Sequence, residues 1–175
     1  MHEILLFAIA VAAFAAVFDW RSGKIPNLLT VGVLLGAPCV MAYVHRGESP
    51  GVYFAASLVG AAVCAFVPGL LAVKQIVGMG DVKLFAALGA VLGARIGIEA
   101  EFYGFAVAAL VGPARLAYEG KLFRSIYDTV LVVARPRGQI AGRRQLIEHL
   151  TTRFSMGPAV FVGTAVTAWL HWRAV

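Results

Sequence analysis

The sequence predicts an all-α protein that crosses a membrane about six times. Hydrophobic residues make up 61% of the 175 positions and charged residues 14%, against roughly half and about a quarter in a soluble domain. Six apolar stretches approach the ~17 to 25 residues that a helix needs to cross the hydrocarbon core. They cover residues 3–18, 28–44, 52–73, 82–97, 102–118 and 157–172. We therefore expect one polytopic membrane domain over residues 1–175.

The first apolar stretch has an alternative interpretation as a secretory signal, because it is rich in alanine and has small residues at cleavage spacing. A signal carries its positive charge before the apolar core. Here Glu3 stands at the start of the stretch, whereas Arg21 and Lys24 follow it. This charge order favours a retained helix that runs from outside to inside.

The later stretches follow the same length criterion. Those at 82–97 and 157–172 are short, so we expect local bilayer thinning or snorkelling side chains at their ends. Glu99 and Glu101 fall between the fourth and fifth stretches. We therefore expect both glutamates in a loop outside the membrane.

Lysine and arginine are concentrated in the connections after the first, third and fifth stretches and at the stretch ends beside them, which together hold 12 of the 15 basic residues. Basic residues in short loops remain on the cytoplasmic side, so both chain ends are expected outside the cytoplasm. The polar segment at about 117–156 is divided by Pro136 and Gly138. We expect it at the cytoplasmic headgroups, either as a connector that contacts lipid or as a lid or substrate-docking segment.

The net charge of +6 is explained by these loops, and no basic motif interleaved with aromatic residues suggests nucleic acid binding. Anionic lipid of the bilayer is the expected partner of the basic residues. Cys39 and Cys64 lie inside apolar stretches and read as small hydrophobic residues. The four histidines are scattered, so we expect neither a metal nor a cofactor.

Two aspartates are the candidate catalytic residues. The chain has three aspartates, and Asp19 and Asp81 each lie where an apolar stretch meets a charged loop on the predicted cytoplasmic side. An ionisable residue at such a position suggests a functional site. Two nearby carboxylates do not both ionise comfortably, so one acts as a base while the other holds a proton. This pattern predicts an aspartic protease, and Asp128 is expected to have no such role.

The residues beside the two acids are expected to shape the site. Gly78 and Gly80 precede Asp81, and we expect them to allow close backbone approach and a positive φ. Pro26 and Asn27 are expected to start the second helix, with Asn27 as a cap or as a hydrogen-bond partner. Two lysines, Lys24 and Lys83, belong to the same two sequence motifs.

These motifs resemble those of the prepilin peptidases, which are membrane-embedded aspartic proteases of the GxGD type. The resemblance rests on Asp-x-x-x-x-Lys-Ile-Pro-Asn at 19–27 and on Gly-Met-Gly-Asp-Val-Lys at 78–83. Met156-Gly157-Pro158 is similar to a Gly-Pro start of the last helix in that family, although the usual aromatic residue before the glycine is missing. The chain looks like the short, peptidase-only type of Tad/Flp pilus systems or of archaeal preflagellin and prepilin peptidases.

The resemblance implies a hydrolase that removes the leader peptide of type IV prepilin-like proteins at the cytoplasmic face of the cell membrane. Asp19 and Asp81 match the catalytic pair of that family. A small proton-coupled transporter and a non-catalytic membrane protein of pilus assembly remain alternatives. A proton relay would need further acids inside the membrane, whereas Glu99 and Glu101 are expected in the outer loop.

Overall fold

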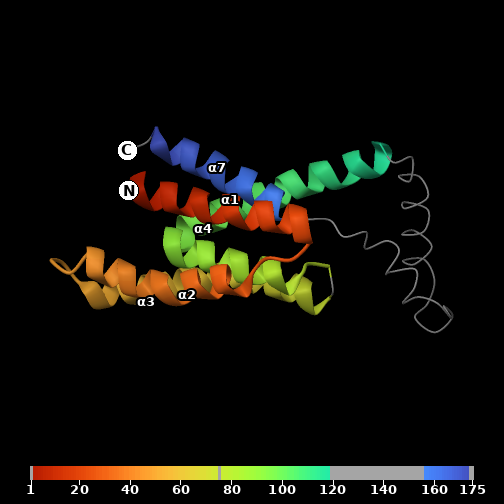
Figure 1. Cartoon of the computed structure of the whole chain (residues 1–175). Coiled ribbons are helices and arrows are strands. Elements are labelled where there is room, and N and C mark those ends of the chain that lie inside the picture. The colour runs from red at the N-terminus through yellow and green to blue at the C-terminus, as the bar shows by residue number, and fades with distance from the viewer. Residues whose placement is uncertain (1, 75, 119–155, 174–175) are drawn as a thin grey trace. The chain divides into compact units, whose positions relative to one another are not determined.

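The computed structural model describes residues 2–74, 76–118 and 156–173, and this part of the chain contains helices and no strand. The helices are α1 (His2–Ser22), α2 (Asn27–Val44), α3 (Pro50–Val73), α4 (Met79–Tyr118) and α7 (Gly157–Trp172) (Figure 1). The predicted all-α class is thus confirmed. By length and composition, α1, α2 and α3 can cross a membrane, and the count of six spans stays a prediction.

The chain divides into two compact units, Met1–Ala108 with Ser155–Val175, and Ala109–Phe154. All contacts described below belong to the first unit. Of the second unit, the structure describes residues 109–118, which are the last turns of α4. Most of the predicted interfacial segment at 117–156, including Asp128, lies outside the described residues.

Helix α1 buries a stripe of small residues. Its buried positions include Ala8, Ala12, Ala15 and Ala16, and the stripe ends at Asp19. Their spacing of three or four residues places them on one face of the helix. The opposite face carries exposed Phe7, Phe14 and Phe18 among other apolar residues, as expected for a surface that faces lipid. Asp19 therefore points to the protein side of α1.

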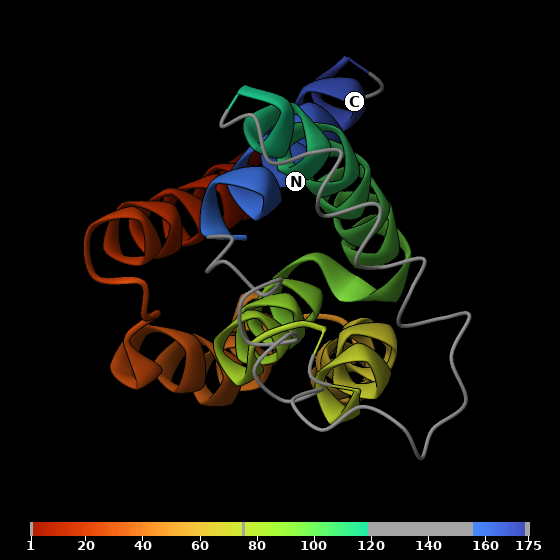
Figure 2. The same ribbon diagram turned by 90° about the vertical axis from the view of Figure 1, so that its right-hand side faces the viewer.

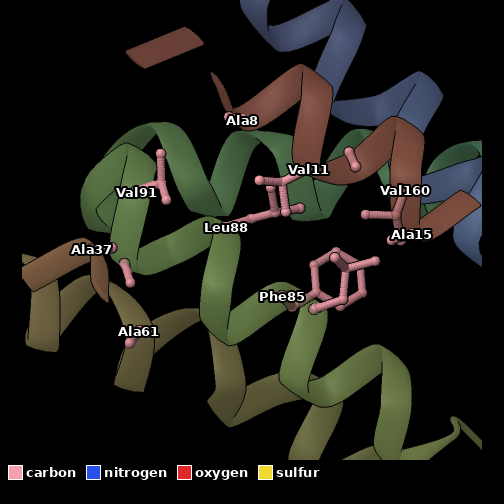
Figure 3. Close-up of a cluster of buried hydrophobic side chains, with 12 residues drawn as sticks. Ala8, Val11, Ala15, Ala37, Ala61, Phe85, Leu88, Val91 and Val160 are labelled. Atoms are coloured by element: carbon pink, nitrogen blue, oxygen red, sulfur yellow. The ribbon is translucent and has the colours of Figure 1, made fainter. Parts of the chain in front are cut away.

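Small side chains allow α1 and α7 to pack closely, and the two helices run side by side in two perpendicular views (Figures 1 and 2). Helix α2 packs against α3 in the same unit. A cluster of buried apolar residues connects these pairs to the first half of α4 (Figure 3). Figure 3 labels Ala8, Val11 and Ala15 from α1, Ala37 from α2, Ala61 from α3, Phe85, Leu88 and Val91 from α4, and Val160 from α7.

Helix α4 has one break, at Gly93, whose φ of 76° and ψ of 170° are not helical. This left-handed region favours glycine because a side chain would be strained there. The predicted loop between 82–97 and 102–118 is wrong, because residues 98–101 are helical. Glu99 and Glu101 accordingly lie within α4, and Glu101 is buried.

Glycine pairs bring α4 against two neighbours, backbone to backbone. A Cβ added to Gly60 of α3 would overlap the carbonyl oxygen of Gly89, and one added to Gly163 of α7 would overlap the amide nitrogen of Gly104. Close approach through small residues is a common way for helices to associate in lipid. Gly89 in the first half of α4 is thus held against α3, and Gly104 beyond Gly93 against α7.

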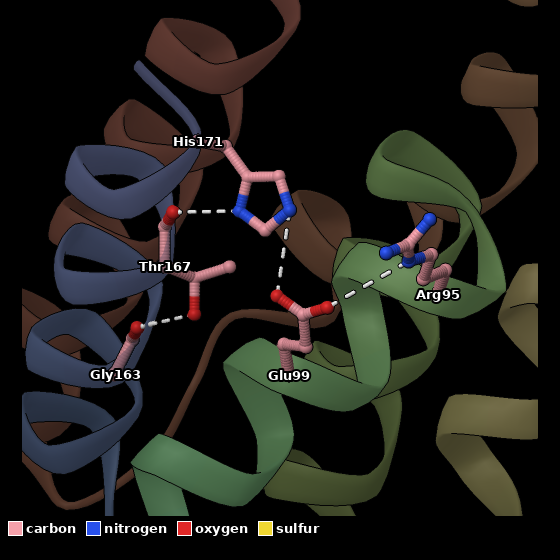
Figure 4. A network of polar contacts seen from close by, with 5 residues as sticks. All are labelled: Arg95, Glu99, Gly163, Thr167 and His171. Atoms are coloured by element: carbon pink, nitrogen blue, oxygen red, sulfur yellow. Dashed lines mark hydrogen bonds and ion pairs between the residues drawn. The ribbon is translucent and has the colours of Figure 1, made fainter. Parts of the chain in front are cut away.

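A polar network also joins α4 to α7 (Figure 4). The Glu99 carboxylate lies 3.4 Å from His171 Nε2 and 3.9 Å from Arg95 Nε. His171 Nδ1 is 3.0 Å from the Thr167 carbonyl oxygen, and the Thr167 hydroxyl donates to the Gly163 carbonyl oxygen at 3.0 Å. Because the Arg95 side chain is 90% exposed, its pair with Glu99 contributes little to stability.

The contact between Gly60 and Gly89 predicts a position-dependent response to alanine. Replacing an exposed helical glycine by alanine favours the helix by up to about 1 kcal/mol. In Gly60→Ala the overlap with Gly89 costs about 1 to 3 kcal/mol, so we expect a melting temperature lower by several degrees in detergent. The matched variant Gly69→Ala in the same helix meets nothing within 4 Å and should melt no lower than the wild type. Equal melting temperatures for the two variants would contradict the close packing of α3 on α4.

Candidate active site

The end of α1 sets the position of Asp19. Gly23 has a φ of 61°, and its amide donates to the Asp19 carbonyl oxygen at 2.8 Å, which is a left-handed glycine stop. The Ser22 hydroxyl closes the same turn by donating to the Phe18 carbonyl oxygen at 2.7 Å. Asp19 consequently lies in the last turn of α1, and the residue is 8% exposed.

The Asp19 side chain accepts a hydrogen bond from the start of α7. The Gly157 amide nitrogen lies 2.8 Å from Asp19 Oδ2, and the contact is buried. A Cβ added to Gly157 would come within 2.8 Å of Asp19 Cβ and 2.9 Å of Oδ2. Gly157 thus brings the α7 backbone directly against the carboxylate, in a position that sequence reasoning marked only through Gly157-Pro158.

Asp81 lies in the first turn of α4, one residue before the predicted 82–97 span, and is 9% exposed. It shares its buried face with Leu84, Phe85 and Leu88, at the spacing of one helix face. Burial is the main cause that raises the pKa of Asp81 to about 6, and the negative charge of Asp19 raises it further. The hydrogen bond from the Gly78 backbone acts in the opposite direction. The structure therefore brings the two predicted acids into electrostatic reach of each other.

The connection between α1 and α2 lies against the start of α4. A Cβ on Gly80 would contact the Ile25 side chain at 3.7 Å, and Lys83 Nζ donates to Asn27 Oδ1 at 2.9 Å. Asn27 is the first residue of α2, and Pro26 at the N-cap makes no side-chain cap bond. Asn27 was predicted either to cap the helix or to be a hydrogen-bond partner, and in the structure it accepts the bond from Lys83. Pro26 directly precedes α2 at the N-cap position, and Lys24 is exposed.

The expectation of a positive φ at Gly78 and Gly80 is wrong, because in the described part of the chain only Gly23 and Gly93 have a positive φ. The reason for glycine at 78 is space: a Cβ there would lie 3.1 Å from Asp81 Oδ2. A larger side chain would therefore crowd the carboxylate. No group of three or more metal-binding side chains occurs within the described residues.

Two buried carboxylates, of which one has a raised pKa, form a group that can hold one proton and accept another. Such a pair can activate a water molecule and protonate a leaving group without a metal. The helical fold with this pair at the joined ends of α1, α4 and α7 is typical of a membrane-embedded acid–base enzyme.

Residues 6–113 match the type IV leader peptidase family, which covers more than half of the chain. The protein belongs to this family and is a peptidase. Comparison with curated proteins and with solved structures gave no match. The match includes Asp19 and Asp81 but ends before Gly157 of α7.

The bond between Lys83 and Asn27 joins the two motifs, and we expect it to contribute to activity. Lys83→Met keeps most of the side-chain length but removes the donor, which should lower kcat/KM about fivefold, or ~1 kcal/mol. Peptidase assays of Lys83→Met, Asn27→Ala and the double variant form a mutant cycle. The double variant should lose no more than either single variant. Losses that multiply would indicate that the two side chains act independently.

Proposed function

We propose that this protein is an aspartic endopeptidase that removes the leader peptide of type IV prepilin-like proteins at the cytoplasmic face of the membrane. Membership of the type IV leader peptidase family supports the class of reaction. The single observation that carries the aspartic mechanism is the pairing of Asp19 with Asp81. These acids come from two helices and are 62 positions apart, yet the charge of one raises the pKa of the other.

The proposed reaction begins with one water between the two carboxyl groups. The ionised acid takes a proton from this water as the water oxygen attacks the amide carbon of the substrate. The protonated acid donates a hydrogen bond to the developing oxyanion, and the pair then supplies the proton that the leaving amine needs. Metal ions take no part in this scheme, so chelators should leave activity unchanged.

A peptide bond inside a helix is hydrogen-bonded and shielded, so the substrate must be extended at the cut. Glycine before the scissile bond suits this requirement, because it loosens the helix and adds no side chain. Gly78 is exposed beside Asp81 and Gly80 is half-buried, which leaves room for a second backbone. We propose that the apolar helix of the substrate lies beside α1 and α4, with its basic leader held by anionic lipid.

Two aromatic–arginine pairs support a membrane–water interface at helix ends away from the two acids. The Arg46 guanidinium lies 4.8 Å from the Tyr43 ring centre, and that of Arg173 lies 4.4 Å from the Trp169 ring centre. Both pairs are at the C-terminal ends of their helices, α2 and α7. In contrast, Asp81 lies in the first turn of α4, and Asp19 contacts the start of α7. Aromatic residues with arginines are typical of a membrane–water interface, here the one opposite the acids.

One sequence argument against a transporter no longer holds, but a second one does. Glu101 is buried within α4 instead of lying in an outer loop. No acid occurs between Asp81 and Glu99 in the sequence, however, so α4 offers no continuous relay of carboxyl groups along its length. Family membership also favours a peptidase over a transporter or a non-catalytic assembly protein.

The two-acid mechanism predicts that Asp19→Asn and Asp81→Asn each lower processing of a co-expressed prepilin by at least about 100-fold. Asparagine keeps the shape of the side chain but neither accepts the proton of the water nor holds one to donate. The assay is mass spectrometry of the mature substrate N-terminus, with membrane levels of each variant measured in parallel. Asp128→Asn is the matched control and should process normally. Substantial turnover by either of the first two variants would remove the two-acid mechanism.

The proposed topology predicts from which side of the membrane an introduced cysteine reacts with a labelling reagent. Single cysteines are introduced after Cys39 and Cys64 have been replaced. A cysteine at Ser22, next to the acids, should react with an impermeant maleimide only from the cytoplasm. One at Ser49, between α2 and α3, should react only from outside. Reaction of both from the same side would contradict the proposed location of the active site.

A further inference from the structure

We infer that Gly157 is a positioning residue whose amide holds Asp19 as the carboxylate of the pair, so that Asp19 is the base and Asp81 the acid. This assignment rests on the proposed function and goes beyond it, because the sequence motifs treat the two aspartates alike. It follows from the different partners that the two side chains have.

The start of α7 offers a well-placed donor to Asp19. The Gly157 amide is 2.8 Å from Asp19 Oδ2 in a buried contact, and an amide can only donate. The next residue is Pro158, which has no N–H, and the Val160 amide already donates to the Met156 carbonyl oxygen at 3.0 Å. A donor at a helix N-terminus binds the ionised form of a carboxyl group more strongly than the neutral form.

Asp19 needs such a donor because it lies in the last turn of α1. The carbonyl groups at a helix C-terminus carry partial negative charge, which opposes a carboxylate there. Helix α7 meets this turn with its positive end and offsets the effect.

Asp81 has different surroundings. It lies in the first turn of α4, where the helix dipole favours negative charge, and the Gly78 backbone lowers its pKa. Burial and the charge of Asp19 outweigh both influences, and the pKa is raised to about 6. The charges of Lys83 and Lys24 do not reverse this balance, because the Lys83 bond to Asn27 is exposed and Lys24 is exposed, so that water screens both charges. Asp81 is therefore the member of the pair suited to carry the proton.

The proton transfers balance under this assignment. Asp19 takes one proton from water, and Asp81 gives its proton to the carbonyl oxygen as the new C–O bond forms. Asp19 then protonates the leaving nitrogen as the C–N bond breaks, while one hydroxyl of the intermediate returns a proton to Asp81. Both acids finish in their starting states, with one carboxylic acid and one amine as products.

Chemical labelling of the wild-type protein tests the assignment without a proteolysis assay. An epoxide is opened by a carboxylate, which acts as the nucleophile, whereas a carbodiimide adds to a protonated carboxyl group. In detergent near pH 6, peptide mapping should place the epoxide ester on Asp19 and the carbodiimide adduct on Asp81. The reverse pattern, or equal labelling of both acids by both reagents, would overturn the inference. A failure of prepilin cleavage would instead count against the proposed function alone.

A second test uses Gly157→Ala, in which the added Cβ would displace the Asp19 side chain. We expect kcat to fall at least tenfold with little change in KM, and the epoxide ester to move in part to Asp81. Gly36→Ala is the matched control, because a Cβ there meets nothing within 4 Å, and its labelling and kcat should equal those of the wild type. Lower activity of Gly157→Ala with the epoxide ester still confined to Asp19 would mean that Gly157 contributes packing alone. If Gly157→Ala does not fold, the wild-type labelling decides.

Discussion

The buried carboxylate of Asp19 imposes the main constraint on this structure. A charged group removed from water is costly unless donors satisfy it, and α1 by itself presents only carbonyl groups at this end. The donor comes from the far end of the sequence, through the Gly157 amide 138 positions away. The alanine stripe of α1 is a consequence of this contact, because larger residues at Ala15 or Ala16 would keep the α7 backbone at a distance.

Helix α4 has to satisfy two neighbours that lie in different directions. Gly89 contacts the backbone of α3, whereas Gly104 contacts that of α7. In a straight helix, the distance and the angle between Gly89 and Gly104 would be fixed by the rise and rotation per residue. The break at Gly93 removes that restriction, so that the two halves can run in different directions. The first half can thus hold Asp81 toward α1 while the second half follows α7.

The sequence was sufficient to predict the helical class and to mark the two acids as candidates, but not to show that they lie close together. Asp19 and Asp81 could be found because each interrupts an otherwise apolar pattern at a helix end. The Gly93 break was missed because several glycines occur in this helix and the conformation of each depends on its neighbours. The helical position of Glu99 and Glu101 was missed for a related reason, since charged residues suggest a loop unless a partner such as His171 is known. The role of Gly157 depends on a contact between distant segments, which no local pattern reveals.

The location of the acids at helix ends has a further consequence for a peptidase. A site in the middle of a helix would be surrounded by side chains and by backbone groups already bonded within the helix. At this end, α1 stops at Gly23 while α4 and α7 begin, and the first amides of a helix have no partner inside it. One such amide already binds Asp19. The same arrangement provides the polar backbone and the small residues that an extended substrate strand requires. In the proposed reaction these helix ends supply both the donor that stabilises Asp19 and the space for an unwound peptide, which accounts for the glycine, proline and aspartate that cluster there.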